Sequence, residues 1–133
     1  MNIWIKGGRV IDPERAIDKV QDVFISDGII MAEDRCPSGF VADKTITASG
    51  LVICPGLVDI SARLGDSRSG FKGSLEQELR AALAGGVTRL GCPPDMSPAL
   101  DQPGLVTMLR DRANALDSAK IFPVGALTKS LSG

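Results

Sequence analysis

The fold is decided by the stretch Leu51-Val52-Ile53-Cys54-Pro55-Gly56-Leu57-Val58-Asp59-Ile60-Ser61-Ala62-Arg63-Leu64-Gly65. Its nearly continuous apolar run is interrupted by Pro55-Gly56, which mark a turn. The residues that follow, 57–61, have the composition of a strand buried on both faces of a parallel sheet. The chain then becomes polar and glycine-rich. Loops of this kind at the ends of parallel strands carry the sites of α/β folds.

Helices and strands alternate after this first strand. The predicted elements are helix 75–84, strand 87–92, a second helix from about 103 to 116, and strand 120–127. Ser74 and Gln77 have the spacing of a capping box at the start of the first helix, and Asp101 and Pro103 open the second. The order β-α-β-α-β predicts a parallel sheet with right-handed crossovers. A closed (β/α)8 barrel needs about 250 residues, so residues 55–133 are expected to form the first third of one.

The first 54 residues contain short strands separated by turns. The predicted strands are residues 3–5, 9–12, 22–26, 28–32 and 44–48. Asp27-Gly28 is a strong signal for a two-residue hairpin turn. This pattern predicts part of a small β-sandwich or barrel-like sheet. The expected organisation is therefore α/β, with a small β-sandwich part at 1–54 and βαβαβ units at 55–133.

Composition argues against several classes of protein. A net charge of −1 gives no electrostatic case for binding nucleic acid or an anionic membrane. No apolar run approaches the roughly 18 residues of a membrane span, and the first residues do not form a signal peptide, so a cytoplasmic protein is expected. The three cysteines form no Cys-x-x-Cys pair and are interpreted as buried or unreactive free thiols. The chain has no histidine, the commonest metal ligand and the usual acid–base group near neutral pH.

The central stretch also carries a family resemblance. Residues 55–59, Pro-Gly-Leu-Val-Asp, resemble the segment that precedes x-His-x-His-Leu-Arg in the dihydroorotase branch of the amidohydrolase superfamily. Residues 82–88 resemble the family's Ala-Ala-x-Gly-Gly-x-Thr, and residues 93–101 resemble its Met-Pro-Asn-Thr-x-Pro-Val-x-Asp. The resemblance covers about the whole chain. It implies a small β-sandwich built from both chain ends and a (β/α)8 barrel of the TIM type, here truncated.

The chain departs from the family pattern at the metal site. The resemblance implies that the two histidines of the motif bind a catalytic divalent metal, zinc in this family, and here Ser61 and Arg63 stand in their places. A serine hydroxyl is a poor zinc ligand, and a guanidinium is a permanent cation without an acceptor lone pair. The substrate-binding arginine and asparagine of the family correspond to Gly65 and Asp95. We therefore predict no catalytic residue, no bound metal and no cofactor for this chain.

The resemblance is strongest to one group within the family. Pro-Pro-Asp at 93–95, Gly-Ala-Leu-Thr-Lys at 125–129 and the missing histidines look most like the non-catalytic homologues that accompany aspartate transcarbamoylase in some bacteria. This implies a structural partner of the aspartate transcarbamoylase catalytic chain in pyrimidine biosynthesis, and an oligomer. Two alternatives stay open. One is an active metal-dependent cyclic-amide hydrolase whose site is completed by residues beyond 133, and the other is a truncated product without a function of its own.

A structural role is predicted for Arg63. Asp95 follows the second barrel strand and is a candidate to pair with Arg63 or with Arg68. Arg63 is then expected to fill the vacated metal space as an internal substitute for the ion. If the pair is buried, Arg63→Met should destabilise the fold by about 3–5 kcal/mol. Asp59 is expected to make a structural hydrogen bond.

Overall fold

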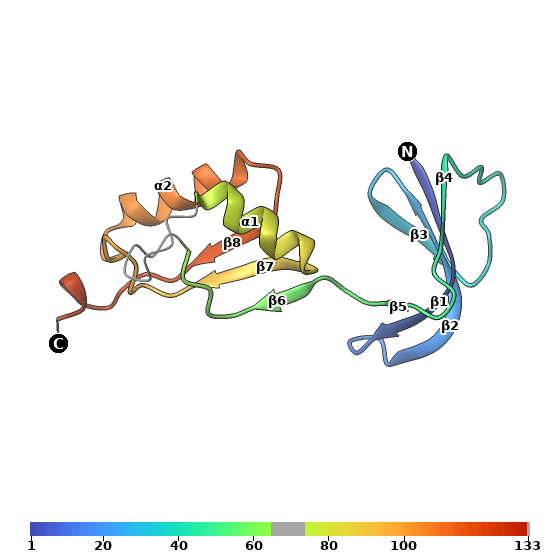
Figure 1. Cartoon of the computed structure of the whole chain (residues 1–133), viewed down its shortest axis with the longest axis horizontal. Coiled ribbons are helices and arrows are strands. Elements are labelled where there is room, and N and C mark those ends of the chain that lie inside the picture. Colours follow the sequence, from blue (N-terminus) through green and yellow to red (C-terminus); the bar gives the residue numbers. More distant parts are fainter. Residues whose placement is uncertain (65–73, 133) are drawn as a thin grey trace. The chain divides into compact units, whose positions relative to one another are not determined.

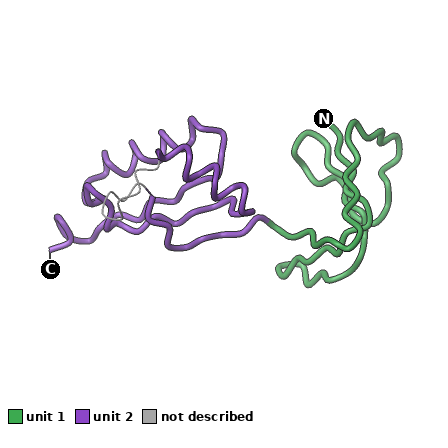
Figure 2. The backbone as a smooth tube through the Cα atoms, in the orientation of Figure 1, with its two compact units in different colours: residues 1–55 green, residues 56–133 purple. Residues whose placement is uncertain are grey.

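The structure is a computed structural model that describes residues 1–64 and 74–132. It divides the chain into two compact units, Met1–Pro55 and Gly56–Gly133 (Figure 2). The first unit consists of strands and the second of strands and helices. The α/β class expected from the sequence is therefore confirmed.

The first unit is a five-stranded sheet (Figure 1). Its strands are β1 (Asn2–Asp12), β2 (Ile17–Ser26), β3 (Ile29–Glu33), β4 (Lys44–Thr47) and β5 (Val52–Ile53). The strand order is β3-β2-β1-β4, and β5 pairs with the second half of β1. Strand β2 runs antiparallel to β1 and to β3, whereas β4 and β5 both run parallel to β1.

The β2–β3 hairpin forms where Asp27-Gly28 predicts it. Asp27 and Gly28 have φ angles of 50° and 81°, and a two-residue type I′ turn requires positive φ at both positions. Glycine adopts this conformation freely, and aspartate is among the few other residues that tolerate it. The hairpin then closes with Ser26 opposite Ile29.

Strand β1 is continuous where the sequence predicted two short strands. It passes Gly7-Gly8 through a register shift between Ile5 and Gly8, with Gly7 at a φ angle of 68°. Asp22 stabilises this bulge, because its Oδ1 accepts a hydrogen bond from the Gly7 N–H at 2.8 Å. Its Oδ2 accepts one from the Trp4 indole N–H at 2.9 Å. The Asp22 side chain of β2 thus accepts the hydrogen bond of the Gly7 N–H at the bulge, in place of a backbone carbonyl.

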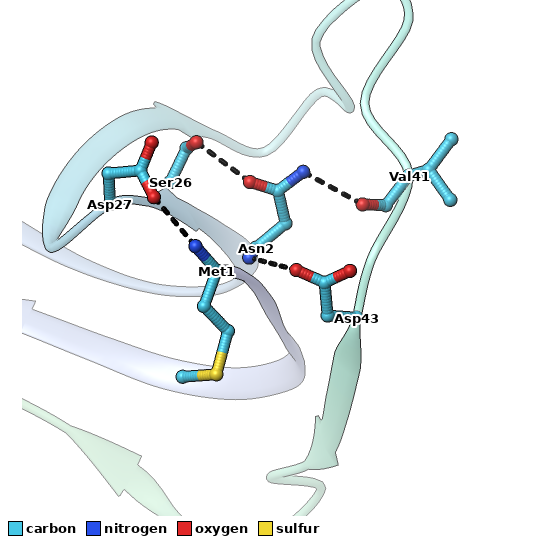
Figure 3. A network of polar contacts seen from close by, with 6 residues as sticks. All are labelled: Met1, Asn2, Ser26, Asp27, Val41 and Asp43. Carbon is cyan, nitrogen blue, oxygen red and sulfur yellow. Dashed lines mark hydrogen bonds and ion pairs between the residues drawn. The ribbon is translucent and has the colours of Figure 1, made fainter.

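A polar network around Asn2 ties the strand ends of the first unit together (Figure 3). The Asn2 side chain donates to the Val41 carbonyl at 2.9 Å and accepts from the Ser26 hydroxyl at 2.7 Å. The Asn2 N–H donates to Oδ2 of Asp43 at 2.7 Å. These contacts join the start of β1 to the end of β2 and to the segment that leads into β4.

The second unit is a three-stranded parallel sheet with two helices packed against it (Figure 1). Its elements are β6 (Leu57–Asp59), α1 (Leu75–Ala84), β7 (Val87–Cys92), α2 (Pro103–Asn114), β8 (Lys120–Pro123) and a 3-10 turn at Lys129–Leu131. The order is β6-β7-β8, and both pairs are parallel. One buried cluster joins Leu79 of α1 and Ala113 of α2 to Leu90, Cys92 and Ile121 of the sheet. Both helices therefore cover the same face of the sheet.

The first helix begins and ends as predicted. The Gln77 N–H donates to the Ser74 hydroxyl at 3.2 Å, and the Ser74 N–H donates to Oε1 of Gln77 at 3.1 Å, which confirms the capping box. Helix α2 begins differently, because Gln102 is its N-cap residue and makes no side-chain cap. The carboxylate of Asp101 instead accepts a hydrogen bond from the Ser130 N–H at 2.8 Å. No helix within residues 1–64 and 74–132 is long and apolar enough to cross a membrane.

In the second unit, the strands predicted at 57–61 and 120–127 are both shorter than expected. Strand β6 has three residues, and Val58 and the following Ile60 are 58% and 86% exposed, so the expected burial on both faces is absent. Strand β6 lies at the edge of the sheet, with only β7 beside it among the described strands. Strand β8 ends at Pro123 because the next residues turn toward the loop after β7. There the Ala126 N–H donates to the Leu100 carbonyl at 2.8 Å.

Candidate functional site

The candidate site lies at the carboxyl ends of β6 and β7. Strand β6 ends at Asp59, whose Oδ1 accepts a hydrogen bond from the Ser61 N–H at 2.9 Å. The structural hydrogen bond expected for Asp59 is therefore confirmed. This side-chain turn directs the chain back toward β7, where the Ala62 N–H donates to the Gly91 carbonyl at 2.8 Å. These two bonds fix the position from which Arg63 extends.

Gly91 permits the backbone of Ile60 to approach β7 closely because glycine has no side chain. A Cβ atom at Gly91 would lie 2.7 Å from the Ile60 carbonyl oxygen and 3.1 Å from its carbon. Both distances are shorter than ordinary van der Waals contacts, and both atoms belong to the backbone. Sequence reasoning missed this close approach, although a glycine inside a strand pattern is a recognised signal for one.

Arg63 and Asp95 form an ion pair across the ends of the two strands. The distance from Arg63 Nε to Asp95 Oδ2 is 2.9 Å. This confirms the predicted pairing of Asp95 with Arg63, while the alternative partner, Arg68, lies outside the described residues. The two side chains are 52% and 38% exposed. The pair is therefore half-exposed, and the large energy expected for a buried pair does not apply.

The residues at the family's metal positions do not fit a zinc ion. Ser61 offers a neutral hydroxyl, and Arg63 offers a cation that already binds a carboxylate. Within residues 1–64 and 74–132, no three Asp, Glu or Cys side chains gather as a metal site would require. Gly65, at the position of the family's substrate-binding arginine, lies outside the described residues. No metal-dependent step can be assigned to this chain's own described side chains.

Cys92, on β7, is the cysteine nearest in sequence to Asp95. It is fully buried in the helix-facing core. Burial raises the pKa of the Cys92 thiol to about 11, and the charge of Asp59 contributes in the same direction. A thiol with so high a pKa stays protonated near neutral pH and is a poor nucleophile. All three cysteines are free, as predicted; Cys92 is buried, and Cys36 and Cys54 are exposed.

The chain is similar over its whole length to part of longer curated proteins. No protein-family model matches it. It is 47% identical over 133 residues to a protein of Pseudomonas aeruginosa named dihydroorotase-like protein. It is 36% identical over 133 residues to a protein of Citrifermentans bemidjiense named dihydroorotase. Each match covers 100% of this chain and 31% of the relative, so the chain spans about a third of the length of the curated relatives it matches.

Solved structures contain the same arrangement of elements. The L-hydantoinase (dihydropyrimidinase) from Arthrobacter aurescens superposes with a TM-score of 0.71 at 22% identity, over 93% of this chain and 27% of that chain. At this identity the match concerns the fold alone. It confirms the expected architecture of a sandwich-like sheet followed by the first parallel β/α units of a barrel.

Proposed function

The chain is dihydroorotase-like over its whole length, and we propose that it is a non-catalytic dihydroorotase-like protein of pyrimidine biosynthesis. The observation that carries this proposal is the Arg63–Asp95 ion pair at the end of β6. A guanidinium and a serine hydroxyl there take the positions at which the family's motif has metal-binding histidines. The higher identity to the dihydroorotase-like protein, 47%, than to the dihydroorotase, 36%, supports the dihydroorotase-like part of this proposal.

Electrostatic repulsion by Arg63 is the physical reason to expect no metal ion at this position. A divalent cation about 4 Å from the Arg63 guanidinium would be repelled by roughly 8 kcal/mol at an effective dielectric constant of 20. Arg63 could swing away, but its ion pair with Asp95 would then be broken, and Arg63 would still supply no ligand. The ion pair and a metal at this position are therefore competing arrangements.

Metal content and ring hydrolysis test the proposal together. The purified chain is incubated with zinc, dialysed and analysed by inductively coupled plasma mass spectrometry, and loss of dihydroorotate is followed in parallel. The C. bemidjiense dihydroorotase, treated identically, is the control. We expect substoichiometric zinc and no dihydroorotate hydrolysis by this chain. Stoichiometric zinc held at the end of β6, together with hydrolysis, would contradict the proposal.

Placing histidines at positions 61 and 63 tests whether the chain lacks only these metal ligands or also the rest of a catalytic site. In the double variant Ser61→His/Arg63→His, zinc binding should rise, because two imidazoles replace a hydroxyl and a cation. Hydrolysis should still be absent, because two imidazoles alone do not complete a catalytic zinc site, which takes three protein ligands. Hydrolysis by the unaltered chain would favour the second candidate, a cyclic-amide hydrolase. The relative named dihydroorotase is the observation that keeps this candidate open.

We also propose the aspartate transcarbamoylase catalytic chain as partner, on the resemblance to non-catalytic homologues alone. Sedimentation velocity of the mixed proteins tests this pairing. A faster-sedimenting complex at fixed stoichiometry is the expected result, and two unchanged boundaries at micromolar concentration would reject it.

A further inference from the structure

The second unit contains a cavity of about 330 Å³ beside its helices. The cavity is bordered by one face of α2, by the start of α1 and by the loop that follows β7. Helix α2 contributes four lining side chains at the spacing i, i+3, i+4 and i+7, which are Leu105, Met108, Leu109 and Arg112. Small-molecule sites typically have volumes of about 300–1,000 Å³. The cavity is therefore large enough for a small ligand.

Most of the cavity wall is apolar. Leu64 and Leu100 line it and are only 7% and 5% exposed. Met96 also lines it and packs against the buried core of the unit. Met108, by contrast, is 50% exposed, so the cavity meets solvent along α2. Methionine side chains are flexible and polarizable and adapt to the shape of a bound group, so this wall suits an apolar ligand.

The charge at the cavity has one sign. Among the described residues that line it, Arg112 is the only charged side chain, and none is Asp or Glu. Arg112 forms no ion pair within residues 1–64 and 74–132. The other polar side chains of the lining are the hydroxyls of Ser74 and Ser97, which can donate hydrogen bonds. A guanidinium binds a carboxylate through two parallel hydrogen bonds, so the cavity favours an anionic ligand over a cationic one.

We propose that this cavity binds a small carboxylic acid with an apolar chain or ring. The carboxylate lies against Arg112, and the apolar part lies against the leucine and methionine side chains. At about 30 Å³ for each water-sized group, the cavity holds roughly ten non-hydrogen atoms, the size of octanoate. Inorganic phosphate or sulfate fits less well, because a hydrated ion without an apolar part gains nothing from this wall. The site uses neither Arg63 nor Asp95, so the inference does not depend on whether the protein is catalytic.

Isothermal titration calorimetry of residues 1–133 with octanoate tests the proposal. The control ligand is 1-octanol, which has the same chain length and no charge. We expect saturable binding of one octanoate per chain, and binding of octanol that is at least about tenfold weaker, because octanol cannot form the charged hydrogen bonds to Arg112. Octanoate should also raise the melting temperature of the chain, since it binds the folded state.

Substitutions on α2 locate the site. Arg112→Met removes the cation and should weaken octanoate binding at least about tenfold while octanol binding stays unchanged. Arg110→Met is the matched control, because Arg110 lies on the same helix and is absent from the cavity lining; it should leave octanoate binding unchanged. Met108→Glu places a carboxylate at the exposed edge of the cavity and should also weaken octanoate binding. Circular dichroism of each variant verifies that it folds.

Three outcomes would overturn the proposal. Absence of saturable binding at millimolar octanoate would mean that the cavity is not available to a ligand. Equal losses of affinity in Arg112→Met and Arg110→Met would indicate attraction to positive charge in general and not to this site. Equal affinities for octanoate and octanol would show that Arg112 does not select a carboxylate.

Discussion

Replacement of Arg63 by methionine removes one charged hydrogen bond, the one that Arg63 donates to Asp95. The pair has a single contact of 2.9 Å, and its side chains are 52% and 38% exposed. Exposed ion pairs contribute about 0.2–1 kcal/mol, whereas loss of one partner from a buried pair costs about 3–5 kcal/mol. Half-exposure places Arg63 near the upper end of the first range, so we expect a loss of about 1 kcal/mol. In a unit of this size that corresponds to a decrease in melting temperature of roughly 4–8 °C.

Urea unfolding of Arg63→Met, Asp95→Asn and the double variant measures the coupling between the two side chains. The experiment is done with the isolated chain, at low and high salt. Arg80→Met is the matched control, because the Arg80–Glu76 pair spans one helical turn at 2.8 Å and is 73% and 47% exposed. Its loss should cost only about 0.3–0.5 kcal/mol. The Arg63–Asp95 coupling should weaken in high salt, since half-exposed charges are screened.

Two results would refute this reasoning. A loss of about 3 kcal/mol or more for Arg63→Met would mean that the pair behaves as a buried structural element. Zero coupling to Asp95, combined with loss of binding to an anionic ligand, would make Arg63 a binding group and would end its interpretation as a substitute for the metal.

The cysteines and two glycines give further predictions. Iodoacetamide at pH 8 should label Cys36 and Cys54, and Cys92 only after unfolding; rapid labelling of all three in the folded chain would contradict the buried thiol. The neutral Cys92 thiol contributes stability that is fully present below the pKa of the unfolded thiol and is lost as pH rises toward about 11, so the unfolding midpoint should fall over this interval. Gly91→Ala should lower the melting temperature, because its Cβ would lie 2.7 Å from a backbone oxygen. Gly104→Ala in the first turn of α2, where a Cβ meets nothing within 4 Å, should raise stability by at most the roughly 0.5–1 kcal/mol of a helix interior, and equal effects of the two substitutions would refute the steric argument.

Local sequence signals predicted most of the elements. The Ser74–Gln77 capping box and the Asp27-Gly28 turn depend on contacts between residues close in the chain, and both appear as expected. The union of residues 3–5 and 9–12 into one strand was not predictable from composition. It depends on Asp22 of β2, whose carboxylate accepts a hydrogen bond from the Gly7 N–H at the bulge.

Burial was harder to predict than secondary structure. Val58 and Ile60 have the composition of buried strand residues, yet both are exposed because β6 has one neighbouring strand among those described. An apolar composition indicates that a strand can be buried. It does not say which other segment of a protein would bury it. The pairing of Arg63 with Asp95 was predictable, because parallel strands bring their carboxyl ends to one edge.

Strand β1 sets the order in which the first unit can assemble. Its contacts with β2 join Asn2 to Ser26 and Asp12 to Ile17, so this hairpin can close soon after synthesis. Its other edge pairs only with residues far along the chain, since Ile3 pairs with Lys44 and Arg9 with Val52. Contacts so far apart in sequence are slow to form, because the intervening loop must be closed first. Within this unit, the second edge of β1 therefore stays open to other chains until residues up to about 53 are available.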